Sequence, residues 1–179
     1  KIRKILFSKK FILKYVQHKI NKDIFFIPTN HLHRKDINQF LDSNPEEKDT
    51  YIFITKLMPL VKGDLVHAGC YLGEMLPSMS RSLCSGNKLY CFDPIFQHYF
   101  CSRKVIKANN LRNTIIFQCA LSDELGTGGL NTINNKKQLL ASRSSVKKSL
   151  ENEVTFLKID NLEIKNVGCI HLDIEGHEY

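Results

Sequence analysis

The chain has 179 residues, of which 42% are hydrophobic and 25% are charged, and its formal net charge is +8. Such a length suits one folded domain with a short extension, and the composition excludes a disordered or membrane-embedded chain. No stretch approaches the roughly 18 consecutive apolar residues of a membrane-spanning helix, so we expect no transmembrane segment.

The basic excess lies at the N-terminus. Residues 1–22 contain eight of the 26 Lys and Arg residues and no acidic residue, so the remaining chain carries 18 basic and 18 acidic residues. Basic residues that contact nucleic-acid phosphates should line a face of the domain, so we expect no nucleic-acid partner. Ile5, Ile12, Val16 and Ile20 recur near helical spacing. They predict a basic amphipathic helix, which either contacts an anionic surface or a protein or packs on its own domain with a solvated lysine face.

Helical and strand patterns alternate along the rest of the chain. We divide it into a basic, partly helical extension over residues 1–45 and a folded domain over residues 46–179. In chain order we predict a helix over 49–61, a strand over 65–69, a helix over 71–83, a strand over 88–92, a helix over 95–109 and a strand over 114–121. Residues 122–150 should form a loop or an irregular hairpin before strands over 153–164 and 167–176. This alternation predicts an α/β fold with a Rossmann-like, mostly parallel sheet and helices on both faces.

The cysteines indicate a reducing compartment, which we take to be the cytoplasm. They form no C-x-x-C pair and lie mostly inside predicted elements, as small buried hydrophobes do. They are Cys70, Cys84, Cys91, Cys101, Cys119 and Cys169. His31 and His33 lie in a polar stretch without a partner cluster, so we expect surface histidines and no zinc site.

Two turns at strand ends carry the first functional signal, because ligands of an open parallel sheet bind beyond the carboxyl ends of its strands. GCYLG, from Gly69 to Gly73, lets the backbone approach a ligand closely, and a helix that follows would offer free N–H groups to an anionic group. The same spacing also occurs in plain tight turns. Asp93 follows the next strand and is the residue type that pairs with ribose hydroxyls, although it would equally suit a helix cap before Pro94. Together the two turns favour an adenosine-containing cofactor.

The composition of the glycine turn narrows the choice of cofactor. A dinucleotide normally requires G-x-G-x-x-G, because the middle glycine leaves room for the pyrophosphate. Cys70 and Tyr71 occupy the middle of this turn. A smaller ligand with an amino-acid end, S-adenosylmethionine, therefore suits it better.

The segment HLDIEGHEY places three carboxylates and two histidines just behind an apolar strand pattern. Either it carries chemistry, or it is an ordinary strand that runs into a charged turn. Asp173 is the first candidate for a catalytic role in the pocket, followed by Glu175 and His177. Glu178 is equally suited to the first turn of a helix, where the helix dipole favours an acid. Neighbouring acids at a strand end are only part of a metal-ligand set, so we expect no metal.

The successive motifs resemble the FkbM family of S-adenosylmethionine-dependent methyltransferases over about residues 50–179. The segments that carry the resemblance are GDLVHAGCYLG, LYCFDP, the NN of KANN, FQCALSD and TFLKIDNLEIKNVGCIHLDIEGHE. DIEGHE is the most specific, being similar to the family's D-V-E-G-A-E. The resemblance implies a class I methyltransferase fold, methylation of a hydroxyl on a small molecule or sugar, and a pocket wall formed by HLDIEGHEY. It also implies a cofactor site that includes His67, Gly69, Cys70, Tyr71, Gly73, Asp93, Pro94, Ala120 and Leu121.

The chain departs from the family at three positions. His67 stands where the family has an aspartate, Tyr71 where it has an asparagine and His171 where it has a lysine. A neutral histidine still offers one donor and one acceptor, so His67 could take the place of an aspartate that accepts a hydrogen bond. The alternative is a non-catalytic, degenerate methyltransferase-like domain that acts as a binding module.

The end of the sequence yields a further expectation. A class I methyltransferase sheet continues beyond the strand that ends in D-V-E-G, so the visible chain resembles the first part of a domain. Otherwise the strand from Gly168 to Asp173 would lie at an edge, with Ile170, Leu172 and Ile174 poorly covered. We therefore expect a longer native protein, or another chain paired with this edge, as in a homo-oligomer.

Overall fold

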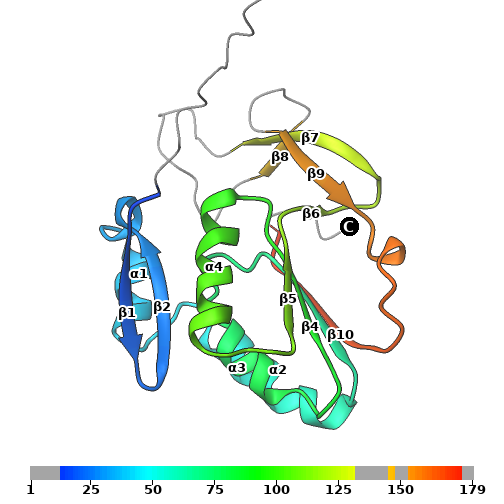
Figure 1. Cartoon of the computed structure of the whole chain (residues 1–179), viewed down its shortest axis with the longest axis horizontal. Coiled ribbons are helices and arrows are strands. Elements are labelled where there is room, and N and C mark those ends of the chain that lie inside the picture. The colour runs from blue at the N-terminus through cyan, green and yellow to red at the C-terminus, as the bar shows by residue number, and fades with distance from the viewer. Residues whose placement is uncertain (1–12, 132–144, 148–152, 175–179) are drawn as a thin grey trace, which may run out of the picture.

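The computed structural model describes residues 13–131, 145–147 and 153–174 (Figure 1). The helices are α1 (Lys35–Leu41), α2 (Lys48–Val61), α3 (Leu76–Ser82) and α4 (Phe96–Ala108), with short 3-10 turns η1 (Thr29–His31) and η2 (Ile159–Asn161). The strands are β1 (Tyr15–Ile20), β2 (Asp23–Pro28), β3 (Asp64–Ala68), β4 (Leu89–Phe92), β5 (Thr114–Phe117), β6 (Ala120–Leu121), β7 (Gly126–Asn131), β8 (Ser145–Lys147), β9 (Glu153–Leu157) and β10 (Val167–Leu172). They form a hairpin, a central sheet and a second sheet.

The central sheet has the order β10-β3-β4-β5, and its pairs are all parallel. The predicted α/β fold with a Rossmann-like parallel sheet is thereby confirmed. From β3 the chain adds β4 and then β5 on one side, whereas β10 pairs with β3 on the other side. The strand order therefore reverses at β3, and the carboxyl ends of β3 and β10 flank the position where such sheets bind ligands.

The two faces of the central sheet are covered differently. On one face, α2 and α3 pack on β3 and β4 through an apolar core that includes Ile54, Met58, Leu65, Leu76, Met79 and Leu89. Burial of each such side chain contributes about 1.5–3 kcal/mol. On the other face, the segment from Leu157 to Ile164, which contains η2, packs on Val66 and Phe92. We expected helices on both faces of the sheet. Among the described residues, helices cover one face, and the irregular segment that contains η2 covers the other.

The N-terminal extension begins, in its described part, with a β-hairpin. Tyr15–Ile20 pairs antiparallel with Asp23–Pro28, so the helix predicted around Val16 and Ile20 is wrong. Side chains in β1 alternate between exposed and half-buried, which is the period of a strand. The loop between the strands contains Asn21 with φ 54°, and asparagine tolerates this conformation in a two-residue hairpin turn. The helical part of residues 1–45 is α1, and residues 1–12 lie outside the described part.

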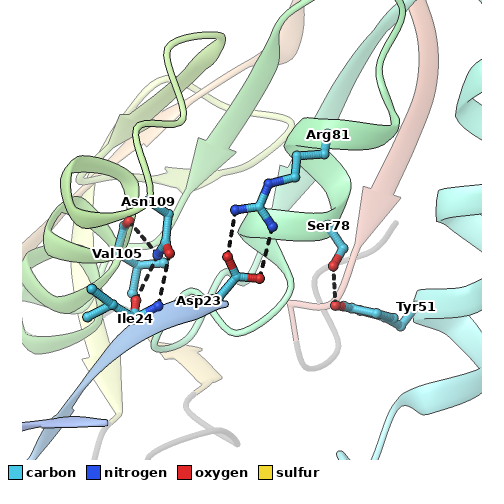
Figure 2. Close-up of polar contacts among 7 residues, drawn as sticks. All are labelled: Asp23, Ile24, Tyr51, Ser78, Arg81, Val105 and Asn109. Atoms are coloured by element: carbon cyan, nitrogen blue, oxygen red, sulfur yellow. Dashed lines mark hydrogen bonds and ion pairs between the residues drawn. The ribbon is translucent and has the colours of Figure 1, made fainter. Parts of the chain in front are cut away.

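The hairpin packs on α4 rather than standing apart from the domain. Phe25 and Ile27 of β2 share an apolar cluster with Cys101 and Val105 of α4. The Asn109 side chain bridges the backbones: its Nδ2 donates to the carbonyl oxygens of Ile24 at 2.7 Å and of Val105 at 2.9 Å, and its Oδ1 accepts the Ile24 N–H at 2.9 Å (Figure 2).

A second contact joins the hairpin tip to α3. The Arg81 guanidinium forms a two-pronged ion pair with Asp23, with Nη1 at 2.9 Å from Oδ2 (Figure 2). In the same view the Tyr51 hydroxyl of α2 contacts the Ser78 hydroxyl of α3. The hairpin, α3 and α4 are thus joined by polar contacts as well as by apolar packing.

The second sheet has the order β6-β9-β7-β8. The predicted strand over 114–121 is divided, because β5 belongs to the central sheet and β6 pairs with β9. Residues 122–150 were expected to be a loop or an irregular hairpin; their described part contains β7 and β8, which pair antiparallel, and β7 also pairs antiparallel with β9 beyond this segment. Residues 132–144 and 148–152 lie outside the description.

Two expectations from the sequence concern the state of the cysteines and the presence of a membrane-spanning helix. All six cysteines are free, and Cys70, Cys91, Cys101 and Cys119 are buried. Among the described residues, no helix combines the length and the apolar character required to cross a bilayer.

Asn109→Ala should lower the free energy of unfolding by about 1–3 kcal/mol, because it leaves the Ile24 backbone groups without their side-chain partner. Urea denaturation followed by circular dichroism measures the change. Lys107→Ala, an exposed substitution in the last turn of the same helix, is the matched control and should be near neutral. Equal stability of Asn109→Ala and the wild type would show that this bridge does not hold the hairpin.

Candidate functional site

The turn after β3 is shaped by its two glycines. Gly69 has φ +85° and Gly73 has φ +80°, a region that side-chain-bearing residues rarely adopt. A Cβ built on Gly69 would lie 1.9 Å from the carbonyl oxygen of Asp173, so the turn packs directly on the end of β10. Gly69 therefore serves the packing of β3 on β10, at the reversal point of the sheet.

The helix predicted over 71–83 begins later than expected. Residues 71–75 form turns, and α3 starts at Leu76. Gly73 donates its N–H to the Cys70 carbonyl at 2.8 Å, which closes the turn on itself. The expected presentation of helix N–H groups to an anion directly behind the glycines is therefore wrong for this turn.

Tyr71 stands in the middle of the turn with φ 46°. Its N–H donates to Asp93 Oδ2 at 2.9 Å, and its carbonyl accepts the Ser102 hydroxyl at 3.1 Å. Its hydroxyl lies 3.2 Å from His31 Nδ1, and the two rings are stacked with centroids 5.9 Å apart. The N-terminal extension thus contacts the turn through His31, which is buried, and not exposed as the sequence predicts.

Asp93 connects the turn to the start of α4. Asp93 is only 3% exposed, and its carboxylate accepts hydrogen bonds from the N–H groups of Tyr71 and Ile95, each at 2.9 Å. His98 Nδ1 lies 3.3 Å from Oδ1. A buried carboxylate requires such partners. Asp93 therefore holds β4, the glycine turn and α4 together, a role close to the helix-cap alternative.

The remaining cofactor candidates differ in their surroundings. Pro94 follows Asp93 at the start of the loop into α4 and is partly exposed. Ala120 and Leu121 form β6 and are 8% and 5% exposed. Leu121 shares an apolar cluster with Ala68 at the end of β3, whereas Ala120 packs with Val154 of the second sheet. Both side chains belong to the apolar core, and Leu121 reaches the end of β3 through Ala68.

His67 and His171 form a cross-strand pair. Parallel pairing sets them opposite each other in β3 and β10, with Nδ1 atoms 2.9 Å apart and rings stacked at 4.9 Å between centroids. One ring must donate and the other accept, so the accepting ring is neutral at this contact. Burial lowers the pKa of His67 to about 3, with the charge of His171 adding to the shift, and burial also lowers the pKa of His171.

Glu74 is a site residue that the sequence reasoning missed. It follows the glycine turn directly, and burial raises its pKa to about 7. Repulsion from further carboxylates adds to the shift, and these are Asp36, Glu47, Asp173 and Glu46. Asp36 is itself ion-paired with Arg34 at 3.0 Å. The end of the sheet therefore gathers carboxylates around a glutamate that is half-protonated near neutral pH. An acid next to a glycine turn was the signal that could have revealed it.

Asp173 follows β10 at the edge of this group of acids. Its N–H donates to the Ala68 carbonyl at 3.1 Å, which continues the pairing of β10 with β3. Asp173 is exposed. Of the predicted catalytic residues, Glu175 and His177 lie outside the described residues. Cys70 is buried, and burial raises its thiol pKa well above the usual value, so it stays a neutral thiol that lies 3.4 Å from the His67 carbonyl.

Metal ligation receives no support from the described residues. Over 13–131, 145–147 and 153–174, no group of three or more His, Cys, Asp or Glu side chains could hold an ion.

Comparisons with known proteins find low similarity. No protein-family model matches the chain, and no curated protein sequence matches it. Among solved structures, a putative O-methyltransferase from Klebsiella pneumoniae aligns over 38% of this chain and 32% of its own, with 17% identity and a TM-score of 0.36. The O-methyltransferase from Bacillus cereus in complex with SAH aligns over 49% and 46%, with 19% identity and a TM-score of 0.37. M. jannaschii TYW2 in complex with AdoMet aligns over 64% and 53%, with 11% identity and a TM-score of 0.42. The chain thus spans from about a third to about half of these structures, and the similarity is too low to assign a function.

The histidine pair makes stability depend on pH. Because the folded pKa values of His67 and His171 lie below the unfolded value of about 6.5, the unfolded state binds more protons at acidic pH. The free energy of unfolding should therefore fall as pH decreases from about 6.5 toward 5. Replacing both histidines with leucine should flatten this decrease, as measured by urea denaturation at several pH values. Gln17→Leu, an exposed hairpin substitution that changes no titratable group, should leave the slope unchanged. An equally steep slope in the double variant would contradict the assignment.

Proposed function

We propose that the carboxyl ends of β3 and β10 bind S-adenosylmethionine and that the chain is a methyltransferase of FkbM type. The observation that carries this proposal is the group of carboxylates around Glu74, set beside a glycine turn at the reversal point of a parallel sheet. The position is the one at which open α/β sheets bind nucleotides. The charge favours a cationic ligand over a dinucleotide with its anionic pyrophosphate.

The residues present fit this cofactor by charge. S-adenosylmethionine carries an ammonium and a sulfonium group, and a partly buried carboxylate is stabilised by a nearby cation. Glu74 is the side chain we assign to the ammonium end, because it follows Gly73 and because burial and neighbouring carboxylates raise its pKa, an environment that a cation would relieve. Bound cofactor would lower the pKa of Glu74 and release its proton.

Asp93 has two roles in the proposed cofactor binding. Through the N–H of Tyr71 it fixes the turn on which the cofactor would lie. Its Oδ2 accepts a single N–H contact among the described residues, and a carboxylate oxygen has two acceptor sites, so capacity is left for a ribose hydroxyl. The other cofactor contacts that we propose are His67, Cys70, Pro94, Ala120 and Leu121, as the resemblance implies.

The proposed reaction is methyl transfer to a hydroxyl of a small molecule or sugar. When bound, the cofactor supplies an electrophilic methyl group on sulfur. The contribution of the chain is to hold the acceptor oxygen roughly 3 Å from that carbon and in line with the bond that breaks. Asp173 is exposed at the end of β10, where its carboxylate can accept the proton of the hydroxyl. Glu175 and His177 remain proposed catalytic partners on sequence grounds.

The runner-up function is a binding module without catalysis. The observation that favours it is the internal use of the turn: Asp93 and Ser102 already occupy the N–H and carbonyl groups of Tyr71. Such a turn would leave fewer polar groups for a cofactor. The calorimetric experiment below separates the two functions, because only the methyltransferase requires S-adenosylmethionine to bind.

Glu74→Gln should weaken S-adenosylmethionine binding by about tenfold or more, because it removes a charge-assisted hydrogen bond worth about 1.5–3 kcal/mol. Isothermal titration calorimetry with S-adenosylmethionine and with its demethylated product measures the effect. Equal losses for both ligands place Glu74 at the ammonium, whereas a loss for the sulfonium ligand alone places it at the sulfur. Glu124→Gln, an exposed residue before β7, is the matched control. No binding to the wild type would reject the methyltransferase and leave the binding module.

Asp173→Asn should lower turnover by roughly a hundredfold while cofactor affinity changes little, because amide nitrogen and oxygen cannot take the hydroxyl proton. Formation of S-adenosylhomocysteine with a panel of sugar and small-molecule hydroxyl acceptors measures turnover. Turnover equal to that of the wild type would exclude Asp173 as the base.

A further inference from the structure

Two segments without acidic residues meet in the folded chain. Residues 1–22 contain no Asp or Glu, and the same holds for residues 94–122, which contain Arg103, Lys104, Lys107 and Arg112. The second segment includes α4, and the hairpin of β1 and β2 packs on this helix (Figure 1). β1, with Lys14 before it and Lys19 within it, meets α4 where the Lys104 ammonium lies over the Tyr15 ring. We expected no nucleic-acid partner because the basic residues of the extension were taken to lie apart from the domain. The packing of the hairpin on α4 removes that reason.

A row of aromatic rings crosses the same face. Phe96 and Phe100 of α4 lie with ring centroids 5.9 Å apart, Phe100 and Tyr15 at 5.9 Å, and Tyr15 and Phe26 at 5.7 Å. Phe96 is 45% exposed and Tyr15 is 36% exposed. The Lys104 ammonium lies 4.5 Å from the centroid of the Tyr15 ring. The same ammonium also lies over the rings of Phe26 and Phe100, so Phe96 and Tyr15 are the exposed rings of the row.

The row starts beside the candidate site. Phe96 is the first residue of α4, and its neighbour Ile95 donates the N–H that Asp93 accepts. The row then runs along α4 to the hairpin. The carboxylates that act on Glu74 come from other segments: neither α4 nor β1 contributes one of them.

We propose that this basic–aromatic face, formed by Tyr15, Phe96, Phe100, Arg103, Lys104 and Lys107, binds single-stranded nucleic acid. Single strands are bound by cationic side chains that follow the phosphates and by aromatic rings on which unpaired bases stack. Both groups are present here with a spacing of rings and charges set by one helix and one hairpin. The proposal does not depend on methyl transfer.

The chemistry of the exposed side chains separates a nucleic acid from an anionic membrane. A helix that inserts into a bilayer surface exposes a broad apolar side with aliphatic residues. The large hydrophobic side chains that β1 and α4 expose are aromatic, Tyr15 and Phe96. Gln17 and Lys19 are the other exposed side chains of β1. The face is therefore suited to stacking rather than to insertion.

The experiment uses the full chain and a fluorescein-labelled oligouridylate, with binding followed by fluorescence anisotropy. Binding should weaken steeply between about 50 and 200 mM salt, because each phosphate contact releases counterions. Phe96→Ala and Tyr15→Ala should each weaken binding about fivefold or more, since each removes a ring on which a base stacks. Arg103→Ala with Lys107→Ala should weaken binding and reduce its salt dependence. The matched controls lie on α2: Phe53→Ala, which removes an exposed ring, and Lys56→Ala, which removes an exposed charge.

Each outcome decides the proposal. Weaker binding in the face variants with unchanged binding in the α2 controls supports it, provided the variants melt at the wild-type temperature. Phe96 is exposed, so Phe96→Ala remains informative if Tyr15→Ala lowers the melting temperature. Three results would overturn the proposal: no binding at about 50 mM salt, equal loss in the α2 controls, or tight binding to phosphatidylserine vesicles without binding to the oligonucleotide.

Discussion

The buried carboxylate of Asp93 is the interaction on which the candidate site depends. It accepts the N–H of Tyr71 from the glycine turn and the N–H of Ile95 before α4, and His98 lies beside it. Hydrogen bonds to a charged group contribute about 1.5–3 kcal/mol each, and a buried charge without them would be strongly unfavourable. The geometry of the turn, the start of α4 and the position of Phe96 all follow from this arrangement.

His67 and His171, two positions at which the sequence differs from the FkbM pattern that it resembles, are in contact in the structure. The family has an aspartate at the position of His67 and a lysine at the position of His171, and the structure sets these positions opposite each other in β3 and β10. In this chain the two positions hold a histidine–histidine contact, with the Nδ1 atoms 2.9 Å apart. Each ring thereby gives the other a polar partner, as a buried polar group requires.

The sequence predicted the central sheet well because its signals are local. Apolar runs bounded by turns specify β3 and β4, and the helix after Asp93 begins within one residue of its predicted start. The hairpin was missed because four apolar residues in a charged segment fit a helical period, whereas the decisive contact, Phe25 and Ile27 against α4, is distant in sequence. Glu74 was missed for the same reason: its raised pKa arises from carboxylates that only the fold brings near.

Charge complementarity is the central claim of this account, and proton linkage tests it most directly. Near pH 6.5 the ammonium of S-adenosylmethionine is already charged, while Glu74, with a pKa of about 7, is largely protonated. Calorimetric titration in buffers of different ionisation enthalpy gives the number of protons exchanged on binding. We expect a net release that disappears in Glu74→Gln. Binding with no proton release, or with proton uptake, would contradict the claim that a cation meets Glu74 at this site.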